Sequence, residues 1–319
     1  MKFDGFLVAM LAAVALALLW PAPGAEEGFL HLGAVTRAGI ALVFFVHGVM
    51  LSPQAIRAGV AKWRLHLLVQ LTTFVAFPLF GVLLYFGARA VLSDELRLGF
   101  VLLCAMSSTI SSSVAMTVMA RGDVASAVFN ASVSGLIGML MTPLLVQAMT
   151  GADQHGVPLA GAIAGILVTL VAPMALGQLL RSALLPSLMP CRSWLARLDR
   201  SVIVLIVYAS FCESTAAGVW ISFAWRQLVI TALLSLALLV IMLIATRHAA
   251  RAAGFSREEE IAAVFCGSKK SLASGAPIAK ILFAGHPGLG LIMLPLMMYH
   301  QIQLVVCTVL ARRYARVVE

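Results

Sequence analysis

The sequence predicts an all-α polytopic membrane protein with ten transmembrane helices, and three observations support this fold class. First, 62% of the 319 residues are hydrophobic and only 11% are charged, whereas about a quarter of the residues in a soluble domain are charged. Second, apolar runs of about 20 residues, the length that a helix needs to cross the bilayer, recur along the chain. Third, the basic residues concentrate in every second segment between these runs.

The apolar runs predict ten spanning helices within a single membrane domain, residues 1–319. The first run also has the features of a cleavable signal peptide: a lysine, an apolar centre and small residues. Asp4 in its short leader and the even total of ten both favour a retained helix. The predicted helices cover residues 4–20, 34–51, 65–88, 97–119, 125–149, 158–180, 201–220, 228–246, 261–284 and 289–311.

The charges between the runs predict the orientation in the membrane. If the N-terminal side is the inner side, inner segments hold fifteen of the 22 Lys and Arg residues and outer segments hold four. Cytoplasmic loops carry the excess of Lys and Arg, so both termini are expected in the cytoplasm. Alanine- and arginine-rich usage suggests a bacterial inner membrane. Because the basic residues are scattered singly, the net charge of +9 does not indicate a nucleic-acid partner.

The ten runs divide into two halves of five, at about 1–150 and 151–319. Because each half has an odd number of helices, the sixth helix starts on the opposite side of the membrane from the first. Two equivalent halves would therefore be inverted repeats, a common plan among transporters. The fourth run of each half has a polar interruption, MSSTISSSVAMT at 106–117 and CGSKKSLASGAP at 266–277. Such a pair predicts discontinuous helices that form a binding site near the middle of the bilayer.

The hydroxyl-rich interruption allows two interpretations. Six hydroxyl side chains fall within residues 107–113, and small residues also serve close helix packing in membranes. Hydroxyls compete for backbone hydrogen bonds, however, so a dense run at the centre of a span favours an unwound, cavity-lining stretch. No Gly or Pro enforces a break there, whereas the second interruption contains Gly267, Gly275 and Pro277.

Two adjacent lysines, Lys269 and Lys270, lie near the middle of the ninth run. They follow Ile261 by about 12–14 Å along a helix, in a hydrocarbon core about 30 Å thick. Snorkelling to the interface suits lysines near helix ends, so it explains Lys280 but not the central pair. An intramembrane lysine is a functional hypothesis by default, facing protein or water. A role in proton coupling is therefore open.

Three further polar residues lie within the predicted runs. Glu213, in the seventh run, is the obvious acidic partner for a lysine, although its position toward the outer end also suits the interface. His300 and Gln301 lie in the tenth run, within MMYHQIQL. A packing role remains an alternative for His300. The five cysteines lie far apart without a CxxC pair, so no disulfide framework or metal site is expected.

With these features located, the chain resembles the bile acid:sodium symporter family along its whole length, and especially its sodium/bile acid cotransporter 7-like branch. The resemblance rests on SSVAMTVMARGDVASAV at 112–128, GSKKS at 267–271 and Tyr299-His300-Gln301, in this order. It implies a core of spans 3–5 and 8–10, in which spans 4 and 9 cross. A panel of spans 1, 2, 6 and 7 would move against this core, giving alternating access.

The resemblance also implies a substrate class and its contacts. Family substrates are amphipathic organic anions that are carried with sodium. The family's substrate-contact positions correspond to Ser111, Lys270, His300 and Gln301. The expected partners are therefore a small organic anion and membrane lipid.

The family's sodium ligands do not carry over to this chain. Phe265 stands where the family has a glutamate that supplies oxygen to both sodium sites. Ser113 matches the serine of a Ser-Asn pair in the family's fourth span. Other ligand positions hold residues that are apolar, cationic or shorter: Thr73, Val114, Ala127, Ala131, Lys269 and Lys270. Two like charges about 4 Å apart repel by roughly 4 kcal/mol at an effective dielectric of 20. We therefore expect Lys269, alone or with Lys270, to replace the bound sodium ions, with Ser113 and Glu213 as candidate coupling residues.

These observations predict a secondary-active or facilitative carrier of an organic anion that works without sodium, metal or cofactor. Sodium-coupled symport of bile-acid-like anions is the main alternative, and a non-transporting membrane regulator is the second. An enzyme is not expected. The predicted spans lack the central aspartate pair of an intramembrane aspartyl protease, and no GxSxG motif accompanies the serines.

Overall fold

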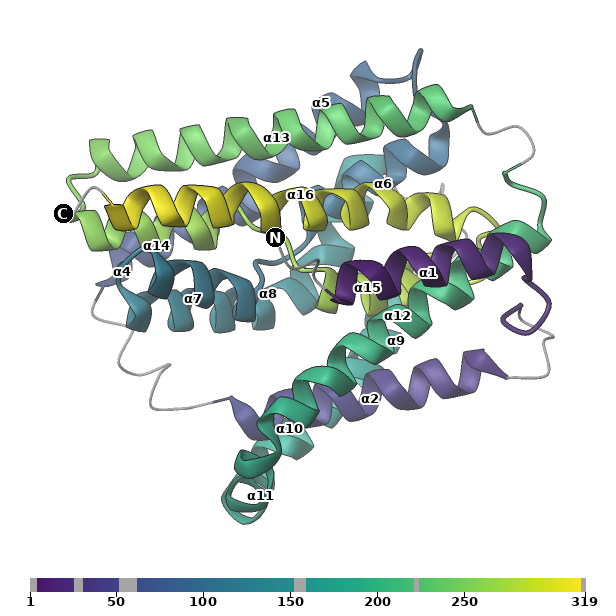
Figure 1. Cartoon of the computed structure of the whole chain (residues 1–319), viewed down its shortest axis with the longest axis horizontal. Helices are drawn as coiled ribbons and strands as arrows, with labels where there is room; N and C mark the ends of the chain where they lie inside the picture. Colours follow the sequence, from purple (N-terminus) through teal and green to yellow (C-terminus); the bar gives the residue numbers. More distant parts are fainter. Residues whose placement is uncertain (1–4, 26–30, 52–61, 152–158, 221–223, 317–319) are drawn as a thin grey trace. The chain divides into compact units, whose positions relative to one another are not determined.

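The computed structural model describes residues 5–25, 31–51, 62–151, 159–220 and 224–316. In these ranges every regular element is a helix (Figure 1). The chain forms two compact units. Unit 1 comprises Met1–Leu51, Asp153–Ala224 and Ala276–Met293, and unit 2 comprises Ser52–Ala152, Trp225–Gly275 and Leu294–Glu319. The all-helical prediction is confirmed.

Unit 1 contains the helices of the N-terminal segment and of the middle of the chain. These are α1 (Gly5–Leu19), α2 (Leu32–Met50), α9 (Leu159–Ile166), the π-helix η3 (Leu167–Val171), α10 (Ala172–Leu179), α11 (Arg181–Leu188), the short 3₁₀ helix η4 (Met189–Cys191) and α12 (Arg192–Ala216). Two glycines allow the backbones of α2 and α10 to approach each other closely. A Cβ on Gly48 of α2 would lie 2.0 Å from the Met174 carbonyl oxygen, and one on Gly177 of α10 would lie 2.0 Å from that of Phe45. Only glycine fits at such backbone contacts between membrane helices.

Unit 2 contains the remaining helices and both polar interruptions. Its helices are α4 (Trp63–Leu71), the π-helix η2 (Thr72–Ala76), α5 (Phe77–Gly87), α6 (Asp94–Ala105), α7 (Ile110–Met119), α8 (Val124–Thr150), α13 (Trp225–Ala252) and α14 (Arg257–Gly267). The first residues of α15 (Leu272–Leu282) and most of α16 (Leu289–Arg316) also belong to it.

Each of the ten predicted ranges falls on helix in the described chain. Six helices or continuous helical stretches are long and apolar enough to cross a membrane, and a seventh span results if the bent pair α6–α7 counts as one. The protein is thus a polytopic membrane protein. The full count of ten spans and their inverted repeat stay predictions.

Both polar interruptions break their helices, as the sequence predicts. The chain is non-helical between α6 and α7 and again between α14 and α15, and the axes of α6 and α7 differ by 60°. The first break is shorter than the hydroxyl run, because Ser111, Ser112 and Ser113 already lie in the first turn of α7. Neither Gly nor Pro causes this break, so hydrogen bonds from outside the helix must stabilise it.

Hydroxyl groups and the second break supply those hydrogen bonds. The Ser108 amide donates to Ser134 Oγ at 3.0 Å, and Thr142 Oγ1 donates to the Ala105 carbonyl at 3.0 Å. The Ser271 amide, in the second break, donates to the Ser107 carbonyl at 3.0 Å. Backbone groups within a membrane need such partners. The two breaks therefore stabilise each other directly.

A cluster of ionised side chains joins three helix ends of unit 2. Lys62 Nζ lies 2.8 Å from Asp123 Oδ2 and 2.8 Å from Glu259 Oε1. Asp123 also caps α8 by accepting from the Ser126 amide, and Glu259 belongs to the capping box of α14. The hydrogen bond from Lys62 lowers the pKa of the Glu259 carboxyl. Burial raises the pKa of Asp123, but hydrogen bonds from Lys62 and Ser126 together outweigh it and lower this pKa.

The stabilising effect of Lys62 is expected to fade in acid. A carboxyl whose folded-state pKa is depressed contributes stability above its unfolded pKa of about 4, and this is lost as the pH falls through the folded pKa. Lys62→Met should therefore cost about 1 kcal/mol or less near pH 7, and nothing once both carboxyls are protonated. Thermal unfolding of both proteins across this pH range measures the difference. A difference that stays constant with pH would contradict the ionic origin.

Candidate functional site

The Lys270 ammonium group is enclosed by backbone carbonyls in the interior of unit 2. Its Nζ donates to the carbonyl oxygens of Thr73 at 3.0 Å, Cys104 at 3.0 Å and Met106 at 2.6 Å. The side chain is fully buried. A lysine has three N–H donors and no acceptor, so the three carbonyls satisfy it completely. We call these three oxygens the carbonyl cage.

The sequence explains why the Thr73 carbonyl is available. In the π-helical stretch η2 the Phe77 amide donates to the Thr72 carbonyl, one residue further back than in an α-helix. The partner of Thr73 in this pattern would be residue 78, which is a proline without an N–H. Pro78 therefore leaves the Thr73 carbonyl free to accept from Lys270.

The break between α6 and α7 frees the other two carbonyls. In a continuous helix the Cys104 carbonyl would accept from Ser108, but that amide donates to Ser134 Oγ instead. The Met106 carbonyl lies in the break itself, beyond the last residue of α6. The broken helix thus provides oxygen acceptors within the membrane domain, which is the usual role of unwound segments in transporters.

Aromatic rings cover the ammonium groups of both lysines. Lys270 Nζ lies 4.0 Å from the centroid of the Phe77 ring, and Lys269 Nζ lies 5.9 Å from that of Phe265. Both distances are within the range of cation–π attraction, which strengthens where water is excluded. The Phe265 ring thus lies within cation–π range of the Lys269 amino group.

Lys269 connects the end of α14 with the start of α7. Its Nζ donates to the Ser112 carbonyl at 2.8 Å, and its side chain is buried. Ser113 Oγ donates to the Phe265 carbonyl at 3.0 Å, and Ser108 Oγ donates to the Cys266 carbonyl at 2.6 Å. The side chains of Lys269, Ser113 and Ser108 thus each donate a hydrogen bond to a backbone carbonyl where these two helices meet.

Helix α16 fixes the second break through Gln303, a residue that the sequence analysis missed. Its Oε1 accepts from the Lys270 amide at 2.9 Å, and its Nε2 donates to the Lys270 carbonyl at 2.9 Å. Nε2 also lies 3.0 Å from His300 Nδ1, while Tyr299 donates its hydroxyl to the Ser268 carbonyl at 2.7 Å. Gln303 follows His300 by three residues and so shares its helix face, which was the available signal.

The structure brings some predicted residues together and places others elsewhere. Lys269, Lys270 and Ser113 lie at the two breaks, and His300 joins them through Gln303. Ser111 is exposed in the first turn of α7, and Gln301 is half-buried in α16.

Glu213 belongs to α12 in unit 1, where its Oε1 lies 3.7 Å from Lys280 Nζ. The lysine that pairs with Glu213 is thus Lys280. The sequence analysis explained Lys280 by snorkelling to the interface and named no acidic partner for it. Glu213 does not pair with the two lysines at the breaks, which donate to backbone carbonyls, and its role in coupling stays a prediction.

The lysine amino groups donate to the carbonyl oxygens of Cys104, Met106 and Ser112 near the first break. Among the described residues, no three His, Cys, Asp or Glu side chains group in a way that could hold a metal ion. Ala127 and Ala131 are buried in α8 and offer no side-chain oxygen.

Paired broken helices with polar groups at their breaks define a class of membrane protein, the secondary transporters. The chain belongs to the SBF-like CPA transporter family, whose sequence model matches residues 4–316. It is therefore a transporter and not an enzyme.

The sequences of individual relatives align with this chain over nearly its whole length. An uncharacterised protein of Pseudomonas aeruginosa is 44% identical, with 98% of this chain and 93% of the relative aligned. The "Putative symporter YfeH" of Escherichia coli is 41% identical, with 99% and 94% aligned. The sodium/bile acid cotransporter 7 of Danio rerio is 28% identical, with 96% and 92% aligned. The resemblance to the bile acid:sodium symporters is thus confirmed.

Proposed function

We propose that this protein carries a small organic anion across the membrane by alternating access, without sodium. The ammonium groups of Lys270 and Lys269 take the place of the alkali ions that sodium-coupled relatives are named for. The observation that carries this proposal is the carbonyl cage around Lys270 Nζ.

The cage has the chemistry of an alkali-ion site. Rings of backbone carbonyls replace the hydration shell of such ions in selective channels. Here the three oxygens lie 2.6–3.0 Å from the Lys270 nitrogen, and three N–H donors for three carbonyls require the protonated, positively charged form. A sodium ion entering the same space would meet this charge at close range, at a cost of roughly 4 kcal/mol at an effective dielectric of 20.

The two lysines suit different tasks. Lys270 uses all three of its N–H groups on carbonyls, which favours the cation-replacing role over direct substrate contact. Lys269 donates to one carbonyl, of Ser112, so it has donors left for an anion. We place the substrate near Lys269, with Ser111, His300 and Gln301 as candidate contacts. The coupling would be proton exchange at a lysine, or the substrate gradient alone.

We further propose the ten-span arrangement that the sequence predicts. Helix falls on each of the ten ranges, and the polar breaks occur in the fourth and ninth of them. The panel of spans 1, 2, 6 and 7 would move against the core that holds both breaks. The protein would lie in the bacterial inner membrane with both termini in the cytoplasm.

Uptake by proteoliposomes tests the proposal. The purified protein is reconstituted, and labelled organic anions, including bile acids, are offered with sodium or potassium as the only external cation. We expect equal initial rates in the two salts. Sodium-coupled symport, which the name of the cotransporter 7 relatives favours, would appear instead as a strict sodium requirement. Absence of uptake of every anion would favour the non-transporting regulator.

A further inference from the structure

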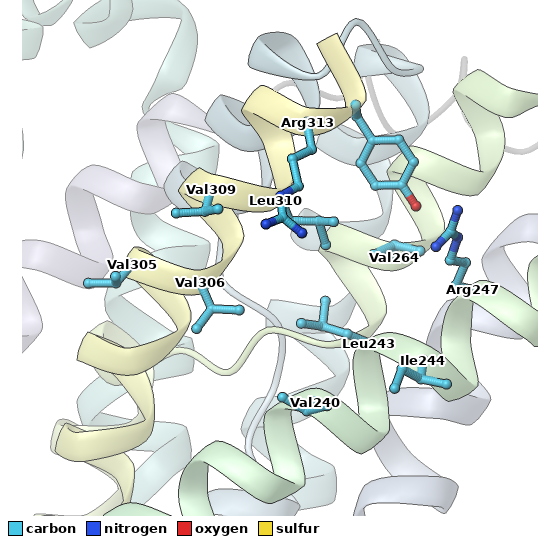
Figure 2. Close-up of a pocket in the computed structure, with 11 residues that line it drawn as sticks. Val240, Leu243, Ile244, Arg247, Val264, Val305, Val306, Val309, Leu310 and Arg313 are labelled. Carbon is cyan, nitrogen blue, oxygen red and sulfur yellow. The ribbon is translucent and has the colours of Figure 1, made fainter. Parts of the chain in front are cut away.

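A largely apolar pocket of about 490 Å³ lies between three helices of unit 2 (Figure 2). Helices α13 and α16 form its sides and α14 contributes Val264. The lining is aliphatic except at one end: Val240, Leu243, Ile244, Val264, Val305, Val306, Val309 and Leu310, with Arg247, Arg313 and Tyr314. Figure 2 shows Arg313 on α16 and Arg247 on α13 on opposite sides of the upper part of the pocket, with Val240 at its lower end.

The depth of the arginines follows from helix length. Helices α13 and α16 each have 28 residues, or about 42 Å at 1.5 Å per residue. This exceeds the hydrocarbon thickness of about 30 Å, so their ends reach the level of the lipid headgroups. Arg247 and Arg313 lie within the last two turns of these helices. Val240 and Val306 precede them by seven residues, about 10 Å deeper in the membrane.

The basic end of the pocket carries more positive charge than its acidic partner neutralises. Glu260 Oε1 lies 3.2 Å from Arg247 Nε, and its Oε2 lies 2.8 Å from Arg251 Nε. The Tyr314 hydroxyl donates to the same carboxylate at 2.9 Å. Within the described residues Arg313 has no ion pair. Two guanidinium groups, Arg247 and Arg313, thus line the pocket, and the one carboxylate near them is shared with Arg251 outside the lining, which leaves a net positive charge there.

We propose that this pocket binds an anionic phospholipid. The headgroup phosphate would lie on Arg313 and Arg247, and one acyl chain would lie along the aliphatic side chains. A guanidinium binds phosphate through paired hydrogen bonds, and basic pockets between membrane helices are suited to acidic headgroups. Val305, Val309 and Ile244 are half-exposed, so in the bilayer the molecules that reach this pocket are lipids.

Lipid titration followed by native mass spectrometry tests the site. The full-length protein is titrated with phosphatidylglycerol and with phosphatidylethanolamine of the same acyl chains. We expect the anionic lipid to bind more tightly, and Arg313→Gln to weaken it about fivefold, since one basic residue near the surface contributes about that factor. Arg312→Gln is the matched control, because Arg312 is the exposed neighbour outside the pocket lining.

A second variant tests the acyl-chain part of the site. Val309→Trp fills the pocket from a half-exposed position and should weaken the anionic lipid while the protein stays folded. Glycerol 1-phosphate, which has the phosphate without acyl chains, should not displace the lipid. Each of three results would overturn the proposal. The first is an equal loss of phosphatidylglycerol affinity in Arg312→Gln and Arg313→Gln. The others are equal binding of both lipids and displacement of the bound lipid by glycerol 1-phosphate.

Discussion

Replacing Lys270 by methionine is expected to abolish uptake and to destabilise the folded protein strongly. Methionine has a similar length but no donor, so the three carbonyls of the cage would lose their partner. A buried acceptor without a partner costs about 1–3 kcal/mol. Part of this is offset because a charge no longer has to be buried. We expect a net loss on the order of 3 kcal/mol, measured by thermal unfolding alongside uptake.

Lys269→Met is the matched control for the cage. It removes a neighbouring lysine that donates to one carbonyl instead of three, so its effect on stability should be about a third as large if each acceptor counts equally. Both variants should lose uptake, because the proposed mechanism needs both charges. Equal destabilisation by the two variants would show that the cage contributes no more than a single contact.

Lys270→Ala tests directly whether the ammonium replaces an alkali ion. Alanine removes the charge and also opens the space that the long side chain fills, while the three cage oxygens, which are backbone atoms of other residues, remain. Sodium, compared with a large organic cation of equal ionic strength, should then raise the unfolding temperature of this variant. It should not do so for the wild-type protein. A wild-type protein that is itself stabilised by sodium would contradict the replacement.

Much of this site could be predicted from the sequence, because polar side chains in apolar runs stand out. The hydroxyls around Ser107 and Ser108 indicated the first break, and the position of Lys269 and Lys270 indicated a buried functional pair. The structure limits the break to fewer residues because the hydroxyls from Ser111 onward lie in the first turn of α7.

What the sequence could not provide were partners supplied by the backbone. The carbonyl of Thr73 is available only because a π-helical turn precedes Pro78, and backbone oxygens have no residue-type signal. Gln303 lies in the same helix as His300, but only the structure shows that it binds the backbone of Lys270 on both sides. Glu213 is a carboxylate whose distance to a lysine depends on tertiary structure, and it pairs with Lys280.

The shape of the first break depends on a glycine in α8. A Cβ on Gly138 would lie 2.5 Å from Ser107 Cβ and 3.4 Å from Ser107 Cα. Ser107 is almost fully buried and adjoins Met106, whose carbonyl belongs to the cage. Its own carbonyl accepts from the Ser271 amide of the second break. A side chain at residue 138 would therefore push Ser107 away from α8 and shift the neighbouring Met106 carbonyl, which accepts a hydrogen bond from Lys270.

Gly138→Ala is expected to impair transport although the residue has no side chain of its own. Overpacking of a buried site costs about 1–3 kcal/mol. A loss of 1.4 kcal/mol in the stability of the cage already lowers the equilibrium constant for its formation about tenfold. Gly135→Ala is the control: it lies on the same helix, and a Cβ there meets nothing within 4 Å. This second variant should be neutral or slightly stabilising, since alanine favours helix over glycine. If Gly138→Ala transported as well as Gly135→Ala, the position of the first break could not be what transport depends on.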